Sequence, residues 1–535
     1  MSSEHTLAAS ARRWALELTR RRSVTGTADE ASFGPWLAER LRREPAFGRA
    51  EVWSFPVAAG DGRHVVAMLI RGKGRRTTVL TGHYDTVSVS DYGELEPFAT
   101  EPDALTGRLQ EKLQTASSAA ERRARYDLGS GAFLPARGLL DMKAGLAAGL
   151  AVAEGFAASP GEGNILFLAV PDEEANSAGA RAAAQKLPSF ASEHGLDLVA
   201  AVNLDAIADD GDGSDGRAIA LGTVGKLLLT AFVAGRATHA GFPLAGLNAA
   251  VLAGAVAQRV EWAPELADPG WSRATPPSLL GIRDDKVGYD VTTPGAAFAT
   301  FNVLFVSRTP AEILDRFDAL CREALAGVLE QLRRRAVGAS GAGPDAVAEV
   351  PVLRFEQVAA KARSASPGDL EAALAEAASL NAPLPERCRL LTERAWRASG
   401  LSGPAVVTGF GSVPYLPTRL SQRQDAQRLA ACCERAAREA AGPTVRCTDV
   451  FAGISDMSFL GEADESSLAL IGANTPAWPL LGLADRGCIA GLPIVNAGPW
   501  GRDYHTPLER MHVSYGFEVL PRMVDSIARR MLQPC

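Results

Sequence analysis

The stretch NILFLAVPDEEANSAGARAAAQKL, residues 164–187, contains the pattern on which the expected fold depends. It opens with a mostly apolar run of strand length, passes through an acidic loop, and continues into an alanine-rich segment with helical spacing. A strand that is apolar along its whole length is typical of one buried on both faces, as in a parallel sheet covered by helices. The stretch therefore predicts a strand–loop–helix unit of an α/β domain.

Two further apolar runs of strand length, RTTVLTG (76–82) and LVAAVNL (198–204), lie on either side of this unit in the chain. Before it comes KAGLAAGLAVAEGFAAS (143–159), whose alanines and leucines are typical of a buried helix. Strands that are buried on both faces and separated by helices indicate an α/β fold. We expect a mostly parallel central sheet that is flanked by helices.

A polar residue stands at or just behind the end of each of these three strands. His83 and Asp205 follow their strands directly, and Glu173 comes shortly after the third. The carboxyl ends of parallel strands meet at one edge of a sheet, and ligands gather there. We therefore expect a functional site at this edge.

A different pattern begins after the polar, glycine-rich connector ADDGDGSDGR (208–217). Strand and helix signals then alternate in a unit that suits a smaller α/β domain inserted into a larger one; the runs are 226–237, 247–262, 296–308 and 310–335. The expected division is a main domain at 1–222 and 336–535 and an inserted domain at 223–335, with a flexible joint at 336–346 and an extra region at about 345–420.

Composition excludes several classes of protein. The chain has 535 residues, too many for one compact core, and its 47% hydrophobic and 22% charged residues are ordinary for a globular protein. A net charge of −7 gives no reason to expect nucleic acid as a partner. No apolar run is long enough to span a membrane, and the N-terminus favours an amphipathic helix over a secretory signal. The seven cysteines form no CxxC pair, so we expect reduced thiols and a cytoplasmic location.

Five short segments carry residues with a potential chemical role, and each has an ordinary structural alternative. A histidine beside an aspartate can be a satisfied pair, an aspartate before a helix can be its cap, and adjacent glutamates can form a solvated loop tip. The candidates are His83 and Asp85 in TGHYDTV (81–87), Asp141 in GLLDMKAG (138–145), Glu173 and Glu174 in PDEE (171–174), Asp205 in NLDA (203–206) and His505 in RDYHTPLERM (502–511).

Taken together, these residues favour a site for two divalent metal ions. Two histidines and three carboxylates, one of them shared, give each ion one imidazole and two carboxylates, which suits Zn²⁺, with Mn²⁺ or Co²⁺ as alternatives. Asp85 lies two residues from His83 and can hydrogen-bond the ring nitrogen that the metal leaves free. Glu173 lies beside a ligand and is the candidate for the carboxylate that moves protons.

The order of these motifs over more than 400 residues resembles that of the M20 family of metallopeptidases and amidohydrolases. SVTGT (23–27) and GISDMSFL (453–460) also look like family segments. The resemblance implies a zinc-peptidase-like catalytic domain with an inserted lid domain. It also implies that one metal is held by His83, Asp141 and Asp205 and the other by Asp141, Glu174 and His505, that Asp85 orients His83, and that Glu173 is the general base.

The expected lid contains further residues that resemble family positions. In GRATHAGFPLAGLNAA (235–250), His239 matches a histidine that, in dimeric relatives, reaches into the partner's site and stabilises the oxyanion. Asn248 and Arg308 match positions that grip a substrate carboxylate. The ordinary alternatives are a surface histidine for His239 and a surface salt bridge for Arg308. The resemblance implies a homodimer formed through the lid.

One subgroup, the RocB-type arginine-utilisation proteins, is similar in finer detail. The carrying features are GTVGKLLL (222–229), the histidine segment of the lid, a long insertion at 91–131 and the region around 350–420. Many carboxypeptidase and deacylase members of the family carry Glu where Asp205 stands, whereas aminopeptidase-like and dipeptidase members often carry Asp. This favours a peptide with a free amine, while acyl amino acids stay open.

The expected function is hydrolysis of an amide bond in a small peptide or an N-acyl amino acid. A hydroxide held by two metal ions would attack the carbonyl carbon, and a glutamate would act as general base. The alternative is a module that keeps the fold and binds a peptide or amino acid without catalysis. Such a module is expected to have lost a ligand or the base, and all six residues are present. We expect neither nucleic acid nor a membrane as partner.

Overall fold

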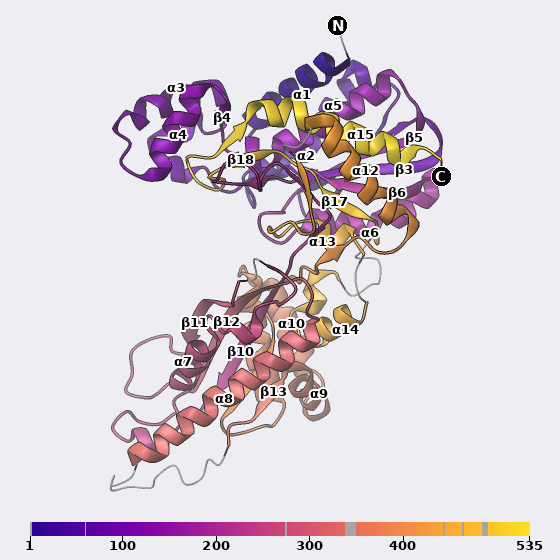
Figure 1. Cartoon of the computed structure of the whole chain (residues 1–535). Helices are drawn as coiled ribbons and strands as arrows, with labels where there is room; N and C mark the ends of the chain where they lie inside the picture. The colour runs from indigo at the N-terminus through magenta and orange to yellow at the C-terminus, as the bar shows by residue number, and fades with distance from the viewer. Residues whose placement is uncertain are drawn as a thin grey trace. The chain divides into compact units, whose positions relative to one another are not determined.

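The computed structural model describes residues 3–58, 60–272, 275–336, 349–441, 445–462, 465–483 and 490–534. The chain forms two compact units (Figure 1). The first comprises 1–224, 418–463 and 487–535, and the second comprises 225–417 and 464–486. All but the first residue of the expected joint, together with Cys488 and Cys535, lie outside the described residues. In the described part of the chain no helix is both long and apolar enough to cross a membrane.

The first unit is built on an eight-stranded sheet. In spatial order its strands are β1 (Glu51–Pro56), β2 (His64–Arg71), β5 (Glu162–Val170), β3 (Lys73–His83), β6 (Asp197–Asn203), β17 (Ile494–Asn496), β8 (Ala218–Ala220) and β16 (Arg446–Thr448). β5, β3, β6 and β17 run parallel, which confirms the mostly parallel centre, whereas β1 and β2 add an antiparallel edge. The first two strands of the chain thus form an antiparallel edge of the sheet, and the sequence pattern did not predict this edge.

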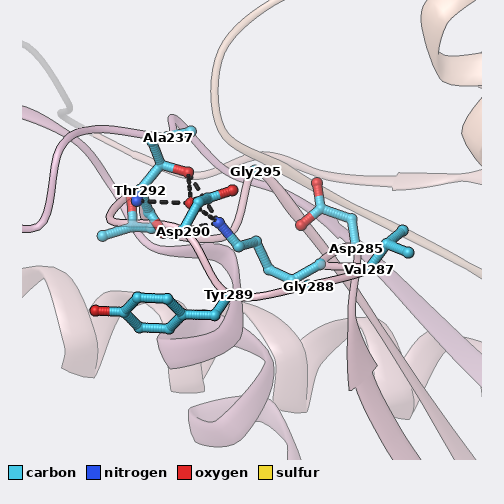
Figure 2. Close-up of a pocket in the computed structure, with 10 residues that line it drawn as sticks. Ala237, Asp285, Val287, Gly288, Tyr289, Asp290, Thr292 and Gly295 are labelled. Atoms are coloured by element: carbon cyan, nitrogen blue, oxygen red, sulfur yellow. Dashed lines mark hydrogen bonds and ion pairs between the residues drawn. The ribbon is translucent and has the colours of Figure 1, made fainter.

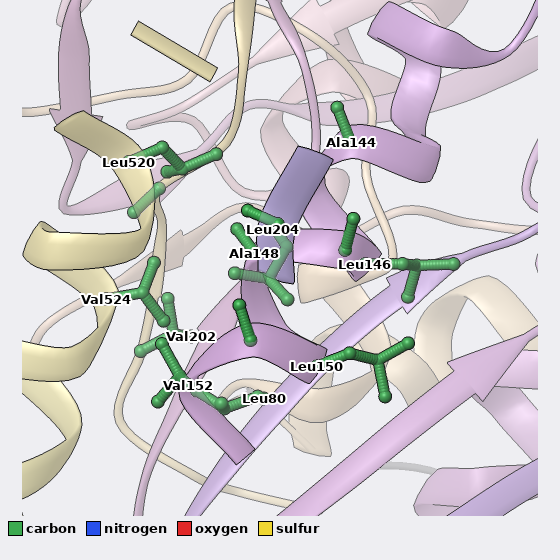
Figure 3. Close-up of a cluster of buried hydrophobic side chains, with 14 of the residues drawn as sticks. Leu80, Ala144, Leu146, Ala148, Leu150, Val152, Val202, Leu204, Leu520 and Val524 are labelled. Carbon is green, nitrogen blue, oxygen red and sulfur yellow. The ribbon is translucent and has the colours of Figure 1, made fainter. Parts of the chain in front are cut away.

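Helix α5 (Ala144–Ala158) forms the centre of the main apolar core (Figure 3). It is apolar on nearly every side because α1 (Ser3–Arg20), α15 (Leu520–Leu532) and the sheet surround it. Gly145 permits this close packing, since a Cβ there would lie 2.0 Å from the carbonyl oxygen of Leu204. Helices α2 (Ala28–Arg43) and α6 (Ala178–His194) contact β2. The core thus fixes the strands whose ends carry the candidate site.

A small four-stranded sheet of the first unit carries one further loop of interest. Its strands are β4 (Phe133–Pro135), β19 (Arg510–His512), β18 (Trp500–Arg502) and β7 (Ile207–Ala208). β18 and β19 form an antiparallel hairpin whose loop, 503–509, contains His505. The insertion at 91–131, here called the helical insertion, leads into β4 (Figure 1). It contains η2 (Ser90–Phe98), α3 (Pro102–Lys112), η3 (Leu113–Thr115) and α4 (Ala119–Ser130), which share an apolar cluster of their own.

The second unit contains a five-stranded sheet with helices packed against it. In spatial order the strands are β11 (Ser278–Asp284), β12 (Ala296–Phe305), β10 (Gly225–Ala234), β14 (Ala405–Phe410) and β13 (Val352–Arg354). The helices include α7 (Ala249–Val260), α8 (Pro310–Ala336), α9 (Phe355–Ala365), α10 (Asp369–Ser379), α11 (Leu384–Ala398) and α14 (Glu465–Ala473). Phe232 of β10, Val407 of β14 and Val358 of α9 belong to one buried cluster.

The extent of this unit differs from the inserted domain expected at 223–335. Strand β14 pairs with β10 along six residues, and β13 pairs with β14, so most of the region around 350–417 joins the second unit. The sequence PAVVTGF (404–410) would suit a buried strand of either sheet, because its local pattern does not specify the partner strand. The bounds of the second unit therefore follow from the strand pairing and not from the sequence pattern.

Replacing Leu150 of α5 with alanine is expected to destabilise the first unit. Leu150 is fully buried in the core around α5, so the cavity should cost about 2–5 kcal/mol of unfolding free energy. The measurement is denaturant unfolding followed by circular dichroism, with Tyr126→Ala as control because Tyr126 is 78% exposed in the same unit. A loss for Leu150→Ala no larger than that of the control would contradict the packing described above.

Candidate metal centre

Three parallel strands deliver candidate residues to one edge of the central sheet. His83 is the last residue of β3, Glu173 and Glu174 follow β5, and Asp205 follows β6. Asp141 lies in the short segment Leu139–Lys143 that precedes α5. His505 reaches the same place from the loop between β18 and β19. The structure therefore brings together the residues that the sequence placed at strand ends.

The side chains form two groups that share Asp141. In the first, His83 Nε2 lies 3.2 Å from Asp141 Oδ1 and 3.5 Å from Asp205 Oδ1. In the second, His505 Nε2 lies 3.0 Å from Asp141 Oδ2 and 3.2 Å from Glu174 Oε1. Within each group the potential ligand atoms all lie within 4.8 Å of one another. This division is the one that the family resemblance implied.

Two buried atoms of these groups lack a hydrogen-bond partner. Within the described residues, neither His83 Nε2 nor Glu174 Oε1 makes a hydrogen bond, although both are fully buried. A buried polar atom without a partner is costly, and most such atoms have an explanation such as an ion. A divalent cation in each group would coordinate these atoms, and the mixed nitrogen and oxygen donors suit zinc or a similar metal.

The acid–base balance of the cluster indicates a shortage of positive charge. Burial lowers the pKa of His83, but the nearby carboxylates of Asp141 and Asp205 outweigh this effect and raise that pKa well above its usual range. Burial raises the pKa of Glu173 well above its usual range, and the nearby carboxylates add to this effect. Burial and Asp141 likewise raise the pKa of Glu174. Without cations, the imidazoles therefore attract protons and the glutamates keep theirs.

Asp85 supports the site in a different way from the one predicted. The His83 ring donates from Nδ1 to the backbone carbonyl of Asp85 at 3.0 Å, because a carbonyl oxygen only accepts. The Asp85 carboxylate instead accepts the backbone N–H groups of Glu173 at 3.1 Å and Glu174 at 3.2 Å, and the hydroxyl of Thr25 at 2.9 Å. Residue 85 thus directs His83 Nε2 towards Asp141 and also fixes the loop after β5.

Two buried asparagines hold the backbone of Asp205, and the sequence did not single them out. Asn496 accepts the N–H of Asp205 at 3.1 Å and donates to its carbonyl oxygen at 2.9 Å. Asn203 donates to the side-chain oxygen of Asn496 at 3.0 Å. Asn496 ends β17, which runs parallel to β6, so only the strand pairing reveals its position.

Two further polar side chains interact electrostatically with the cluster. Asp456, from the segment 453–460, is buried, and burial raises its pKa to about 7 despite the lowering effect of His83. Burial raises the pKa of Tyr504 to about 12, and the carboxylates of Asp141 and Asp205 contribute. The family-like segment 453–460 pointed to this region, but its sequence alone assigned no role to Asp456.

The expected substrate-binding residues all lie in the second unit. His239 is exposed, and its Nδ1 accepts the N–H of Gly241 at 3.0 Å, which leaves Nε2 as the ring nitrogen able to donate. Asn248 is the N-cap of α7, and its side chain accepts the N–H of Ala250 at 2.9 Å. Arg308 Nη1 donates to the carbonyl oxygen of Glu265 at 2.7 Å. Their roles towards a substrate stay predictions.

A cavity of about 390 Å³ lies beside the segment that carries His239 (Figure 2). It is lined by Ala237 and by the hairpin between β11 and β12, where Lys286 contacts Asp290 and Thr292. The backbone of Thr292 pairs with that of His239. The hairpin therefore supports the His239 segment from one side.

Comparison with known proteins agrees with this geometry. A sequence model of peptidase family M20/M25/M40 matches residues 79–477. Protein RocB of Bacillus subtilis (strain 168) is 29% identical to the chain, with 96% of this chain and 93% of RocB covered.

Solved structures share the fold at low sequence identity. A tripeptidase from Staphylococcus aureus has a TM-score of 0.55 and 16% identity, with 98% of this chain and 99% of the tripeptidase covered. The YxeP protein of Bacillus subtilis, a dinuclear metal-binding peptidase from the M20 family, has a TM-score of 0.51 and 11% identity, with 98% of both chains covered. Since the family model matches most of the sequence, this chain belongs to peptidase family M20/M25/M40 and is a hydrolase of that family.

Proposed function

We propose that this chain is a two-metal hydrolase that cleaves an amide bond in a small peptide or an N-acyl amino acid. The observation that carries the proposal is the pair of ligand groups that share Asp141. One ion would be held by His83, Asp141 and Asp205, and the other by Asp141, Glu174 and His505. Zn²⁺ is the proposed metal, with Mn²⁺ or Co²⁺ as alternatives.

When bound, two such ions acidify a water molecule and polarise the carbonyl group of the substrate. The residues of the chain supply orientation and proton transfer. Asp141 offers one oxygen to each group, and Asp85 and Asn496 hold His83 and Asp205 in place. The contacts of Asp85 and Asn496 hold the ligands of the first group in place, which matters because small misplacements reduce rates strongly.

Glu173 is the proposed general base. It belongs to neither ligand group, yet its Oε2 lies 3.9 Å from His83 Nε2, so it borders the site. Burial, the largest effect on its pKa, raises that pKa, which makes the carboxylate a better proton acceptor. Glu173 would take a proton from the attacking water and deliver it to the nitrogen of the leaving amine.

The substrate class rests on the family and on one ligand position. Peptides are the substrates that the family name suggests, and Asp205 stands where many deacylases of the family carry glutamate. This favours a peptide with a free amine, although N-acyl amino acids remain a proposed class. The similarity to RocB adds arginine and ornithine derivatives, and arginine utilisation as a proposed context. A non-catalytic binding module has no observation in its favour, because all five ligand candidates and Glu173 lie together.

We also propose a homodimer formed through the second unit. β11 is an edge strand of its sheet in the described structure, and its Leu280 and Ile282 are 65% and 46% exposed. Exposed apolar edge strands are templates for pairing with another chain. Val251 of α7 is also exposed. In such a dimer, the exposed His239 would donate from Nε2 to the oxyanion in the partner's site.

The proposed location is the cytoplasm, in keeping with five free cysteines among the described residues.

Exhaustive chelation is expected to abolish amide hydrolysis, and added Zn²⁺, Mn²⁺ or Co²⁺ is expected to restore it. The reason is that His83 Nε2 and Glu174 Oε1 are left without partners when no ion is present. The assay is a screen over dipeptides and N-acyl amino acids, including arginine and ornithine derivatives, by detection of released amines. Full activity after complete chelation would rule out the two-metal mechanism.

Glu173→Gln is expected to lower kcat by about 10²–10⁴-fold, the usual contribution of general acid–base catalysis. Its metal content should stay the same, because Glu173 belongs to neither ligand group. The measurements are steady-state kinetics and elemental analysis of the purified variant, with Glu193→Gln on the exposed part of α6 as matched control. Wild-type turnover in Glu173→Gln would show that another group moves the proton.

Ile282→Glu is expected to convert the dimer into monomers and to lower kcat. A charge on β11 opposes edge pairing, and a monomer lacks the partner's His239. Light scattering after size-exclusion chromatography gives the mass, and kinetics are measured on the same fractions. Lys361→Glu on exposed α9 is the control for added charge. A monomeric wild-type protein, or an unchanged dimer of Ile282→Glu, would contradict this interface.

A further inference from the structure

The loop that carries His505 has little support from its own hairpin. β18 and β19 are joined by two residue pairs, and seven residues, 503–509, separate them. The His505 side chain is 41% exposed, whereas that of His83 is 2% exposed. The backbones of Asp503 and His505 have φ values of 52° and 62°, a left-handed conformation that non-glycine residues keep only when their surroundings enforce it.

Asp127 of the helical insertion forms ion pairs with the residues at both ends of this hairpin loop. Its two carboxylate oxygens accept from Arg502 Nη1 at 2.8 and 2.7 Å. Its Oδ2 also accepts from Arg510 Nε at 2.9 Å and Nη2 at 2.7 Å. The side chains of Asp127 and Arg510 are 4% and 0% exposed. One buried carboxylate of α4 therefore joins the last residue of β18 to the first residue of β19.

Further ion pairs complete this contact and balance its charge. Asp503, the first residue of the loop, accepts from Arg510 Nη1 at 2.6 Å and from Arg123 Nη2 of α4 at 3.2 Å. Arg123 Nη2 also lies 3.2 Å from Asp210 Oδ1. Three arginines thus face three aspartates, so the network carries no net charge. Within this network Asp127 and Arg510 are buried, and each loses its charge compensation when the other is removed.

The end of the loop is tied to the helical insertion and to a second ligand candidate. Leu508 packs against the apolar cluster of the insertion. Glu509 accepts from Arg137 Nη1 at 2.6 Å and from the N–H of Gly138 at 3.0 Å. Gly138 directly precedes the segment Leu139–Lys143 that contains Asp141. The loop is therefore fixed relative to Asp141 as well as to the insertion.

We propose that the helical insertion positions His505 for metal binding and that Asp127 is the positioning residue. The inference rests on the proposed two-metal function. It concerns the group of Asp141, Glu174 and His505, because only His505 depends on the hairpin. The other group shares Asp141, but its remaining residues His83 and Asp205 are held by β3 and β6 of the central sheet, so this group serves as an internal reference. A purely structural role for Asp127 would weaken both groups alike or neither.

The test compares the affinities of the two metal sites in variants of the full chain. Apo protein is titrated with Zn²⁺ in a calorimeter, and bound metal is counted by elemental analysis. The wild type is expected to bind two ions. Asp127→Asn should bind the ion of the His505 group about 10–100-fold more weakly, the usual effect of losing a group that orients a ligand. Binding of the ion in the group of His83 and Asp205 should not change, and excess Zn²⁺ should restore kcat.

Two reference variants and one milder variant make the outcome decisive. His505→Ala identifies which binding event belongs to this site. Asp103→Asn is the matched control, because Asp103 lies on α3 of the same insertion with a side chain that is 68% exposed. Arg123→Gln removes only the link to Asp503 and Asp210 and should weaken the same ion to a smaller extent. It carries the test if Asp127→Asn does not fold.

Each result bears on a separate claim. Unchanged affinity for both ions in folded Asp127→Asn would overturn the positioning role. If Asp127→Asn does not fold, unchanged affinity for both ions in Arg123→Gln would overturn it. Equal weakening of both ions would also overturn it, since the insertion would then act on the whole domain. A wild-type protein that binds fewer than two ions would instead refute the two-metal function on which the inference rests.

Discussion

Burial of several carboxylates at one edge of a sheet is the constraint on which the first unit depends. Asp141, Glu174 and Asp205 are each only 8% exposed, and Glu173 is 12% exposed. Removing such charges from water is costly unless opposite charge lies close by. The two imidazoles compensate only part of this negative charge. The pKa of Glu173 indicates this, because burial, its main cause, and the nearby carboxylates raise it. The arrangement is consistent with cations between the side chains, and Asp141 is placed to serve two of them.

This constraint explains why so many surrounding polar groups are committed to the backbone. Asp85 holds the loop after β5, and Asn496 holds the residue after β6, so these contacts to the backbone help to fix the directions of the ligand side chains. Asn496 comes from a strand almost 300 residues away in the chain. The parallel order of β3, β6 and β17 is what brings these residues to one edge.

The sequence predicts that some of the candidate residues lie at one edge of the sheet, because these residues follow long apolar strands whose period and length identify them. His83 and Asp205 are examples, and the parallel sheet follows from the same runs. It does not predict that the Asp85 carboxylate binds backbone N–H groups, because residues i and i+2 share a side in either arrangement. Nor does it show that β14 joins β10, or that Asp127 meets Arg510, since both contacts join segments far apart in the chain. Such pairings depend on long-range packing and leave no local pattern.

The two ligand groups differ in how rigid their supports are. His83 and Asp205 stand at the ends of adjacent strands in the interior of the sheet, where hydrogen bonds on both sides fix the backbone. His505 stands on a hairpin loop with two ladder pairs behind it. Ligands on strands are held more precisely than ligands on loops, so a loop ligand needs support from surrounding residues. The buried arginines and aspartates around Asp127 occur where the backbone gives the least rigidity, so the helical insertion makes physical sense as part of the site.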